Sequence, residues 1–352
     1  MKKVLLGMSG GVDSTVSALL LKKSGYDVIG ITFIMTDAMS EACGSGAAAA
    51  DAARAAAEIG IPHVSLDVRE RFRRNVIDDF AAVYRSGGTP NPCVVCNRTM
   101  KFPEMLAYAD AHGIDCISTG HYASVRHDEH GYHLCTPHDT AKDQTYFLYC
   151  LGQRELGRLI FPLAGLTKDE VRKKAAENGL AAAEKRDSQD ICFIPDGDYK
   201  TFLAAVMGDV PPPGDFTDAA GNILGRHTGI LNYTPGQRKG LGIAAGRPLY
   251  VGGIDAAANR VVLCDENELY RSRVTVRNAS FVSGHPPREP FRAYVKTRYT
   301  RRCSPATVSP ADDCGKFYCI DFDVPERAPA PGQSAVFYSD TELIGGGVIA
   351  EA

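Results

Sequence analysis

The chain has 352 residues, enough for two or three domains and at least one large core. Hydrophobic residues make up 44% of it, which argues against disorder, and no apolar run approaches the ~20 residues of a membrane span. Met1-Lys2-Lys3 leads directly into a strand-like run, which is not the pattern of a signal peptide. The eleven cysteines are therefore expected to be reduced thiols in a cytoplasmic protein with no membrane partner. With a net charge of −3, any nucleic-acid binding must depend on local basic patches.

The first predicted elements are a strand, a glycine-rich turn and a helix. The apolar run Val4–Leu6 precedes the turn, and an apolar-periodic segment, Thr15–Leu21, follows it. Glycines let the turn approach a ligand closely, and its N–H groups form an anion site with the positive end of the helix. The turn lacks both the Walker-type Lys-Ser or Lys-Thr and the Gly-x-Gly-x-x-Gly of dinucleotide-binding folds. The residues of this candidate site are Gly7, Met8, Ser9, Gly10, Gly11, Val12, Asp13 and Ser14.

Strands and helices continue to alternate through the first half of the chain. This alternation predicts an α/β fold with a parallel sheet covered by helices on both faces. Ligands of such sheets bind at the carboxyl ends of the strands, where Met35 and Gly120 also fall. One nucleotide could therefore touch the turn and both residues, although Met35 could equally belong to the core. The predicted strands are Val28–Ile34, His63–Asp67 and Cys116–Thr119, and the predicted helices are Ala47–Ile59, Phe72–Tyr84, Met100–His112 and Lys168–Asn178.

The sequence Ser9-Gly10-Gly11-Val12-Asp13-Ser14 resembles the pyrophosphate-binding loop (PP-loop) of ATP pyrophosphatases. Those enzymes cleave ATP between the α and β phosphates and use AMP to activate an oxygen of their substrate. The resemblance implies that this chain uses ATP. It also implies that Asp13 helps to hold a metal ion, expected to be Mg²⁺, on the pyrophosphate, and that Ser9 and Ser14 contact phosphate.

Three cysteines lie in segments with loop-like composition. Cys93 and Cys96 form a Cys-x-x-Cys in the Gly- and Pro-containing stretch 87–97, which we predict to be a loop. Such a pair could be a redox motif, half of a metal site or two idle thiols. Cys192 lies in a second loop-like stretch, 187–194, after the helix predicted at Lys168–Asn178.

An ordered series of motifs resembles one specific family. The series is similar to the tRNA-specific 2-thiouridylases, which place sulfur on C2 of the wobble uridine of some tRNAs. The resemblance continues into the C-terminal region and so covers nearly the whole chain. After the PP-loop the motifs are TPNPCVVCN at Thr89–Asn97 with Lys101-Phe102, TGHYA at Thr119–Ala123, KDQTYFL at Lys142–Leu148, SQDICF at Ser188–Phe193 and YTPGQRKGLGI at Tyr233–Ile243.

The family resemblance implies a mechanism for sulfur insertion. ATP adenylates the O2 of uridine, and Cys192 delivers sulfur as a persulfide received from a donor protein, either a cysteine desulfurase or a sulfur relay protein. Cys96 is the second catalytic thiol, which attacks the persulfide or closes a Cys96–Cys192 disulfide. Because the thiolate is the reactive form, both thiols should lie in an electropositive, partly open setting. Helix N-termini or the nearby cations Arg98, Lys101, Lys185 and Arg186 could supply it.

One position departs from the family pattern. Many members carry Asp, with a proton-transfer or base-positioning role, where this chain has Cys93. The substitution puts that role in doubt here. It also creates an alternative, in which Cys93, Cys96 and Cys192 hold a [4Fe–4S] cluster with one open iron that binds sulfide.

Several further residues are implied to contact tRNA. The segment Arg288–Arg302 carries six basic side chains and one acidic one. If Phe291–Tyr299 is a strand, one face carries alternating basic and aromatic side chains suited to phosphate contact and base stacking, or simply to solvent. The face would hold Arg292, Tyr294, Lys296 and Arg298, and a second basic cluster is Arg69, Arg71, Arg73 and Arg74. By resemblance, Asn91, Pro92 and Cys93 meet the target base, and His121, Lys142, Asp143, Gln144, Arg298, Tyr299 and Gln333 contact tRNA.

Composition also predicts the domain boundaries. Pro211–Gly214 marks a linker, a Gly-rich stretch of short strands follows, and short alternating strands in the last eighty or so residues predict a small β-barrel. We expect a catalytic domain at 1–208, a central module at 209–271 and a tRNA-contacting barrel at 272–352. Two rival functions remain: another PP-loop enzyme of ligase or sulfate-activating type, and a non-catalytic tRNA-binding protein. Cysteines without a motif are read as packing residues, namely Cys43, Cys116, Cys135, Cys150, Cys264, Cys303, Cys314 and Cys319.

Overall fold

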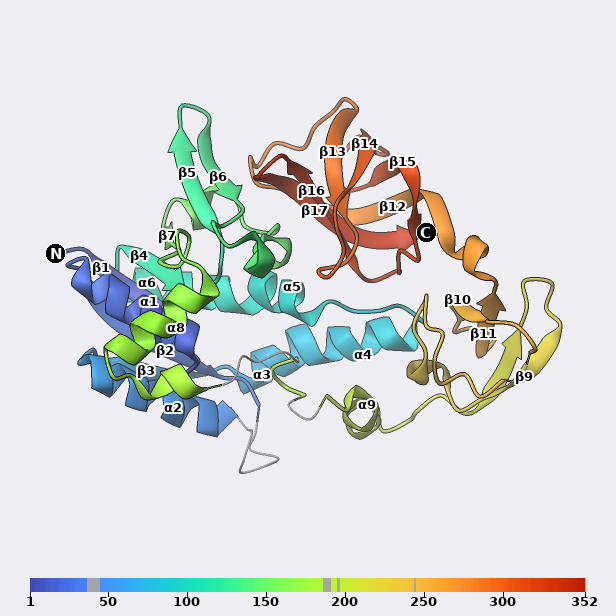
Figure 1. Ribbon diagram of the computed structural model, residues 1–352, viewed down its shortest axis with the longest axis horizontal. Helices are drawn as coiled ribbons and strands as arrows, with labels where there is room; N and C mark the ends of the chain where they lie inside the picture. The colour runs from blue at the N-terminus through green and yellow to red at the C-terminus, as the bar shows by residue number, and fades with distance from the viewer. Residues whose placement is uncertain (37–44, 186–190, 195–196, 244, 352) are drawn as a thin grey trace.

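The computed structural model describes residues 1–36, 45–185, 191–194, 197–243 and 245–351. Within these residues the strands form three sheets, of five, four and eight strands. Figure 1 shows the five-stranded sheet and its helices at one end of the molecule and the four-stranded module at the other. The C-terminal strands lie above the helices that connect the two ends. Among the described residues, no helix combines the length and apolar character needed to cross a bilayer.

The N-terminal sheet is parallel throughout, in the order β3-β2-β1-β4-β7. In β1, Leu5 packs into one core cluster while Val4 and Leu6 pack into another. Alternate side chains of the strand thus enter cores on opposite faces of the sheet, as expected for a strand covered by helices on both sides. The predicted α/β parallel sheet is confirmed. Its elements are β1 Lys3–Gly7, β2 Asp27–Ile34, β3 His63–Asp67, β4 Cys116–Thr119, β7 Leu159–Ile160, α1 Val12–Lys23, α2 Ser45–Ile59 and α8 Lys168–Glu177.

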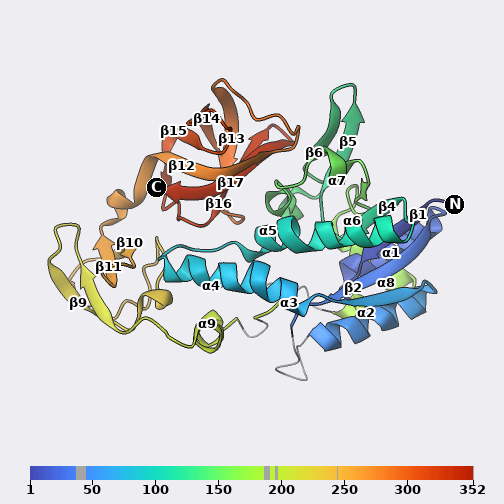
Figure 2. The same ribbon diagram turned by 180° about the vertical axis from the view of Figure 1, so that it is seen from behind.

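Two long helical rods, each interrupted by a π-helical turn, leave this sheet. They run side by side in both views of the molecule (Figures 1 and 2). A π-turn widens a helix locally and is frequent at functional sites. The first rod consists of α3 Arg69–Phe72, a π-turn Arg73–Ile77 and α4 Asp78–Arg85, and the second of α5 Pro92–Cys96, a π-turn Asn97–Lys101 and α6 Phe102–Ala111.

The start of the second rod corrects a prediction. We expected a loop through residue 97, but the helix begins at Pro92. Proline is tolerated at the first helical position because its missing N–H has no helical partner there. The Asn91 side chain caps the helix by accepting a hydrogen bond from the Val94 N–H at 3.4 Å. Cys93 and Cys96 therefore lie in the first turns of a long helical rod.

The central module is a four-stranded sheet in the order β10-β11-β8-β9. Its buried side chains Phe216, Val251 and Leu263 join a single core cluster with Phe72 and Phe80 of the first rod, so the module packs directly onto that rod. Its strands are β8 Gly214–Thr217, β9 Ile223–His227, β10 Tyr250–Asp255 and β11 Arg260–Cys264, and the helix α9 Tyr199–Met207 precedes them. Short helical turns elsewhere are Thr140–Lys142, Thr145–Phe147, α7 Gln153–Leu156, Ala181–Glu184, Ile230–Asn232 and Glu266–Leu269.

The C-terminal strands close into a six-stranded barrel, because β12 pairs with both β15 and β17. The predicted β-barrel is confirmed. In β13, Ala293 and Val295 are buried inside while Arg292 and Tyr294 are exposed, as predicted. The strand ends at Lys296, however, so Arg298 and Tyr299 lie beyond it. The strands are β12 Tyr270–Phe281, β13 Phe291–Lys296, β14 Ser304–Pro310, β15 Tyr318–Arg327, β16 Ser334–Ser339 and β17 Glu342–Glu351.

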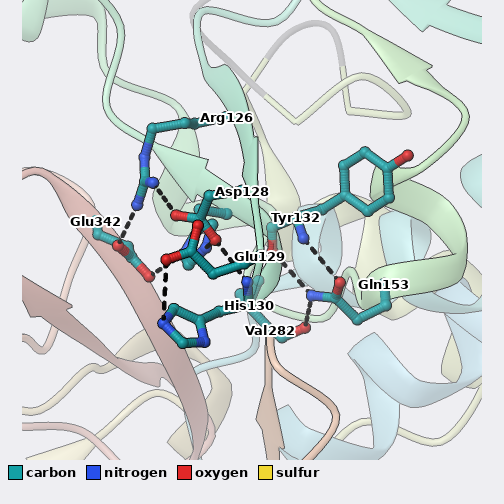
Figure 3. Close-up of polar contacts among 9 residues, drawn as sticks. Arg126, Asp128, Glu129, His130, Tyr132, Gln153, Val282 and Glu342 are labelled. Atoms are coloured by element: carbon teal, nitrogen blue, oxygen red, sulfur yellow. Dashed lines mark hydrogen bonds and ion pairs between the residues drawn. The ribbon is translucent and has the colours of Figure 1, made fainter.

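A hairpin from the N-terminal half extends the barrel sheet. Its strands are β5 Ser124–Asp128 and β6 Gly131–Cys135, and β6 pairs with the barrel strand β17. Figure 3 shows the polar contacts of this junction, where Glu342 of the barrel meets the hairpin. The His133 ring lies between two carboxylates, 2.7 Å from Glu342 Oε1 and 2.9 Å from Asp128 Oδ1. The hairpin thereby joins the first and last parts of the chain.

Candidate active site

The PP-loop lies between β1 and α1 and is held by its own backbone and hydroxyl groups. Gly10 has a φ of +71°, and a Cβ built there would lie 2.7 Å from the Cβ of Asp51 on α2, so only glycine fits. The Ser14 hydroxyl accepts a hydrogen bond from the Ser9 N–H at 3.2 Å and donates one to the Gly11 carbonyl at 3.1 Å. No side chain caps the helix at Gly11, which leaves its first N–H groups to serve as an anion site.

Asp13 is tied to a buried lysine that the sequence reasoning missed. The Lys168 ammonium lies 2.7 Å from both carboxylate oxygens of Asp13, and Lys168 is only 8% exposed. The Tyr122 hydroxyl donates a further bond to Asp13 at 3.0 Å. Lys168 is the first residue of α8, where the helix dipole disfavours a cation, and that placement is the sequence signal that could have pointed to it.

Gly120 meets the PP-loop as predicted from its position after β4. A Cβ on Gly120 would lie 3.0 Å from Asp13 C and from Ser14 N, so the residue after β4 touches the first turn of α1. Met35 follows β2 but is half-buried and packs against the core cluster of the helical rods. The structure thus brings Gly120 directly to the loop and shows the core contact that we gave as the alternative for Met35.

Lys185 also contacts the PP-loop, although we expected it among the cations beside the thiols. Its ammonium lies 3.0 Å from the Gly10 carbonyl oxygen and 2.6 Å from Asp51 Oδ2. The other cation expected from that segment, Arg186, lies outside the described residues. A lysine positioned in this way contributes positive charge to the nucleotide end of the site.

The three candidate thiols come from two segments far apart in the chain. Cys93 and Cys96 are one helical turn apart, Cys93 exposed and Cys96 buried in the core beneath the rods. Cys192 is exposed, but its neighbour Phe193 is buried in the same core as Cys96. The Phe193 ring lies edge-on at 5.5 Å from each of the Phe72 and Phe80 rings, so the Cys192 segment is anchored to the first rod.

Electrostatic interactions show that the three thiols lie near one another. Desolvation by the surrounding protein raises the pKa of Cys192 to about 12, and the nearby Cys93 and Cys96 contribute to that rise. Desolvation likewise raises the pKa values of Cys93 and Cys96, while the Lys101 ammonium acts in the opposite direction on all three thiols. Among the cations that the structure describes, Lys101 is the one that lowers the pKa of all three thiols, but desolvation outweighs it. The expectation of a setting that favours thiolates is therefore not met by the described residues.

The cluster alternative can be tested against the donor set. Within the described ranges, no three His, Cys, Asp or Glu side chains are grouped so that they could hold a metal ion. The described residues thus show no preformed ligand set for a [4Fe–4S] cluster, and no step is derived through one. Ser188, Gln189 and Asp190 of the SQDICF motif lie outside the described residues.

The segment that carries the implied target-base residues is held by the barrel. The Gln333 side-chain amide donates to the carbonyl oxygens of Thr89 at 3.2 Å and Pro90 at 2.9 Å. The Thr89 N–H donates to the Pro331 carbonyl at 2.7 Å. Gln333 thus fixes the residues directly before Asn91, Pro92 and Cys93.

The implied tRNA residues after β4 make mainly internal contacts. His121 accepts or donates a hydrogen bond with Thr119 Oγ1 at 2.8 Å, and burial lowers its pKa well below the usual value, so the ring is neutral. Gln144 pairs with the backbone of Tyr122 through its side chain at 2.9 Å and its N–H at 3.0 Å. Asp143 accepts from the N–H and hydroxyl of Thr145, and Lys142 ends a helical turn and is half-buried.

Several side chains of the barrel that were expected to contact tRNA make contacts within the protein instead. Arg298 donates to the carbonyls of Pro235 in the central module and Ala328 in the barrel, both at 3.0 Å, and so ties these two parts together. Arg292 forms an ion pair with Asp323. The Tyr299 ring is half-buried and packs on Phe147 at 4.6 Å between ring centroids.

Comparison with known families covers nearly the whole chain. A model described as the tRNA methyl transferase HUP domain matches residues 2–196. The tRNA methyl transferase PRC-barrel domain matches 200–265, and the aminomethyltransferase beta-barrel domain matches 271–349. The tRNA-specific 2-thiouridylase MnmA of Acetivibrio thermocellus is 45% identical over 99% of both chains. MnmA of Acidithiobacillus ferrooxidans is 44% identical over 99% of this chain and 98% of its own length.

The chain belongs to the tRNA-specific 2-thiouridylase family. The predicted family is therefore confirmed, together with the enzyme class, tRNA-uridine 2-sulfurtransferase. The descriptions of the domain models mention methyl transfer, but the full-length relatives carry the thiouridylase name.

Solved structures resemble this 2-thiouridylase family member more distantly. A 4-thiouridine synthetase in complex with RNA and bound ATP matches 59% of this chain and 51% of its own, at 18% identity and a TM-score of 0.38. Similarity at this level supports no argument about the site.

Proposed function

We propose that this chain uses ATP to replace O2 of the wobble uridine in tRNA with sulfur. The observation that carries the proposal is the presence of both a PP-loop and a group of three interacting thiols in one chain of this family. The PP-loop lies at the end of β1, and Cys192 interacts electrostatically with Cys93 and Cys96, which lie nearly a hundred residues earlier in the chain. We assign the ATP and thiol chemistry to residues 1–208, the central module to 209–271 and tRNA contact by the barrel to 272–352, in the cytoplasm.

The first step activates a poor electrophile. The uridine O2 attacks the α-phosphorus of ATP, the α–β phosphoanhydride bond breaks, and pyrophosphate leaves. The PP-loop N–H groups would stabilise the departing phosphates, which become more negative as the bond breaks. Asp13 has the hard oxygen atoms that Mg²⁺ prefers, and its Oδ2 atom, bonded only to the Lys168 ammonium among the described residues, keeps a further lone pair. The carboxylate would hold that ion, which neutralises phosphate charge, while still paired with Lys168. Gly120 brings the end of β4 against the same loop.

The second step delivers sulfur. A donor protein, either a cysteine desulfurase or a relay protein, transfers a sulfane sulfur to Cys192, giving Cys192–S–SH. The terminal sulfur attacks C2 of the adenylated uridine and AMP leaves with the former O2. Cys96 then attacks the Cys192 sulfur, which breaks the S–S bond, leaves sulfur on C2 and forms a Cys96–Cys192 disulfide. In the other order, Cys96 attacks the persulfide first and the released hydrosulfide attacks C2. Either route leaves a disulfide that an external thiol must reduce.

The experiment is nucleoside mass spectrometry of tRNA after incubation with ATP, Mg²⁺ and a persulfide source. We expect 2-thiouridine and stoichiometric, tRNA-dependent pyrophosphate release. Pyrophosphate release without tRNA would favour another PP-loop enzyme, and no release at all would favour a non-catalytic tRNA-binding protein. Anaerobic purification with iron analysis tests the cluster alternative, since iron that is required for activity and lost in Cys93→Ala would replace the persulfide route.

A further inference from the structure

Lys185 occupies a defined position at the rim of the PP-loop. Its main chain is fixed, because Arg172 on α8 donates to the carbonyl oxygens of Ala183 at 3.2 Å and Lys185 at 3.1 Å. Its side chain is 39% exposed and reaches Gly10 in the loop. The backbone of Lys185 is thus held in place, while its ammonium contacts the loop and remains partly open to solvent.

The partner of Lys185 is a carboxylate in an unusual place for a phosphate site. Asp51 presses against the loop, since its Cβ lies 2.7 Å from where a Cβ of Gly10 would be. Its carboxylate is 2.6 Å from the Lys185 ammonium and also pairs with Arg54. A phosphate bound at this loop would lie beside the Asp51 carboxylate, and the Lys185 ammonium between them would reduce their repulsion.

Lys168, the second lysine near the PP-loop, is more deeply buried than Lys185 and is held more firmly by its carboxylate partner. The Lys168 side chain is 10% exposed and holds both oxygens of Asp13. Separating that pair would leave a buried charge without its partner, which is costly. The Lys185 pair is half-buried, with side chains 39% and 31% exposed, so it can exchange partners at lower cost than the Lys168 pair.

We propose that Lys185 is a phosphate-binding residue of the nucleotide site. When the pyrophosphate part of ATP occupies the PP-loop, the Lys185 ammonium exchanges the Asp51 carboxylate for a phosphate oxygen. The inference rests on the proposed use of ATP. Asp51 thereby acts as a competitor that holds the ammonium in place until the nucleotide arrives.

The test compares binding of inorganic pyrophosphate and of adenosine by calorimetry, without divalent cations. Lys185→Gln should weaken pyrophosphate binding roughly tenfold or more, because a charge-assisted hydrogen bond is lost, and leave adenosine binding unchanged. Asp51→Asn should act in the opposite direction and tighten pyrophosphate binding several-fold, because repulsion falls and the ammonium is released. Lys173→Gln, an exposed lysine of the neighbouring helix α8, is the matched control and should change neither affinity.

Lys185→Gln should weaken pyrophosphate binding and Asp51→Asn should tighten it. Effects in opposite directions distinguish an ammonium that exchanges Asp51 for phosphate from one that only links α2 to the loop. If Lys185→Gln binds pyrophosphate as wild type does, or if Asp51→Asn weakens binding, Lys185 only ties α2 to the loop and the inference is wrong. If Lys185→Gln does not fold, Asp51→Asn decides: tighter pyrophosphate binding supports exchange, and unchanged or weaker binding refutes it. Lys185→Arg, which keeps the charge, should then bind pyrophosphate as wild type does. Wild-type protein that binds neither ATP nor pyrophosphate would instead overturn the proposed function itself.

Discussion

Gly10 shows how one residue shapes the nucleotide loop. Its positive φ lets the chain turn from β1 into α1, and its missing side chain lets α2 bring Asp51 against the loop. The two requirements are independent, because one concerns the backbone of the loop and the other the space between two elements. A substitution at Gly10 therefore strains the loop backbone and also crowds the contact with Asp51 on α2.

We predict that Gly10→Ala lowers the free energy of unfolding by about 2–4 kcal/mol and abolishes ATP binding. The left-handed backbone costs about 1 kcal/mol for a residue with a Cβ, and overpacking against Asp51 adds about 1–3 kcal/mol. Gly25→Ala is the control, because Gly25 has a similar φ of +82° with nothing within 4 Å of a built Cβ. Urea unfolding of both variants measures the difference. Equal losses would mean that the contact with α2 is unimportant.

The thiols allow a second prediction at this scale. Cys96→Ser and Cys192→Ser should each abolish thiolation while tRNA binding stays within about twofold of wild type, because a hydroxyl cannot carry or resolve a persulfide. Cys314→Ser, a change at an exposed thiol in the barrel, should retain full activity. The measurement is single-turnover 2-thiouridine formation alongside a tRNA binding assay. Thiolation by either active-site variant would refute the assignment of these two roles.

Among the elements, the hairpin β5–β6 makes the most specific connection between the two halves of the chain. Hydrogen bonds to Glu342 and Asp128 raise the pKa of His133, and Arg126 lies against the same two carboxylates. Cys135 on β6 and the exposed His130 and Glu129 of the turn complete the titratable groups facing this junction. The protonated ring therefore binds the hairpin to β17 more tightly than the neutral ring does.

We predict that the junction is stronger at acidic than at alkaline pH. Because the pKa of His133 is higher in the folded protein, its contribution is fully present below the ordinary pKa of about 6.5 and is lost as the pH rises through the raised value. His133→Gln should lower stability at pH 6 and have little effect at pH 9. His130→Gln, at an exposed position of the same hairpin, should have no effect at either pH. Thermal unfolding at the two pH values provides the measurement, and a pH-independent loss for His133→Gln would contradict the ion pair.

For the whole molecule, the barrel does more than add a tRNA-facing surface. It contacts the N-terminal half through β17 and through Gln333, and it contacts the central module through Arg298. The Gln333 contact lies directly before the helix that carries Cys93 and Cys96. A movement of the barrel on RNA binding would therefore displace the start of the helix that carries Cys93 and Cys96.

We predict that Gln333→Met lowers the thiolation rate about tenfold and leaves tRNA affinity unchanged. The substitution keeps the volume but removes two hydrogen bonds to Thr89 and Pro90, each contributing about 0.5–1.5 kcal/mol. Gln237→Met, which loses side-chain hydrogen bonds only within the central module, is the control. Steady-state kinetics and tRNA binding separate the two parameters. Weaker tRNA binding with an unchanged rate would instead support the direct tRNA contact that the family resemblance implies.

Local patterns in the sequence were sufficient for the N-terminal sheet. The strands at His63–Asp67 and Cys116–Thr119 have the predicted bounds, and the glycine-rich turn lies between β1 and α1. These features depend on side-chain alternation and backbone freedom over a few residues. The helix start at Pro92 was missed for a local reason, since an Asn-Pro pair occurs both in loops and at helix N-termini.

By itself, the sequence determined the fold class, the nucleotide loop and the identity of the candidate thiols, because residue type and short-range order carry that information. Only the tertiary structure decided which distant groups meet: Lys168 with Asp13, Lys185 with Asp51 and Gln333 with Thr89. It also decided that Cys96 is buried, which raises the pKa of its thiol. The physical reason is that these contacts join segments more than a hundred residues apart. They arise from how the packed elements close on one another, and no local pattern specifies that closure.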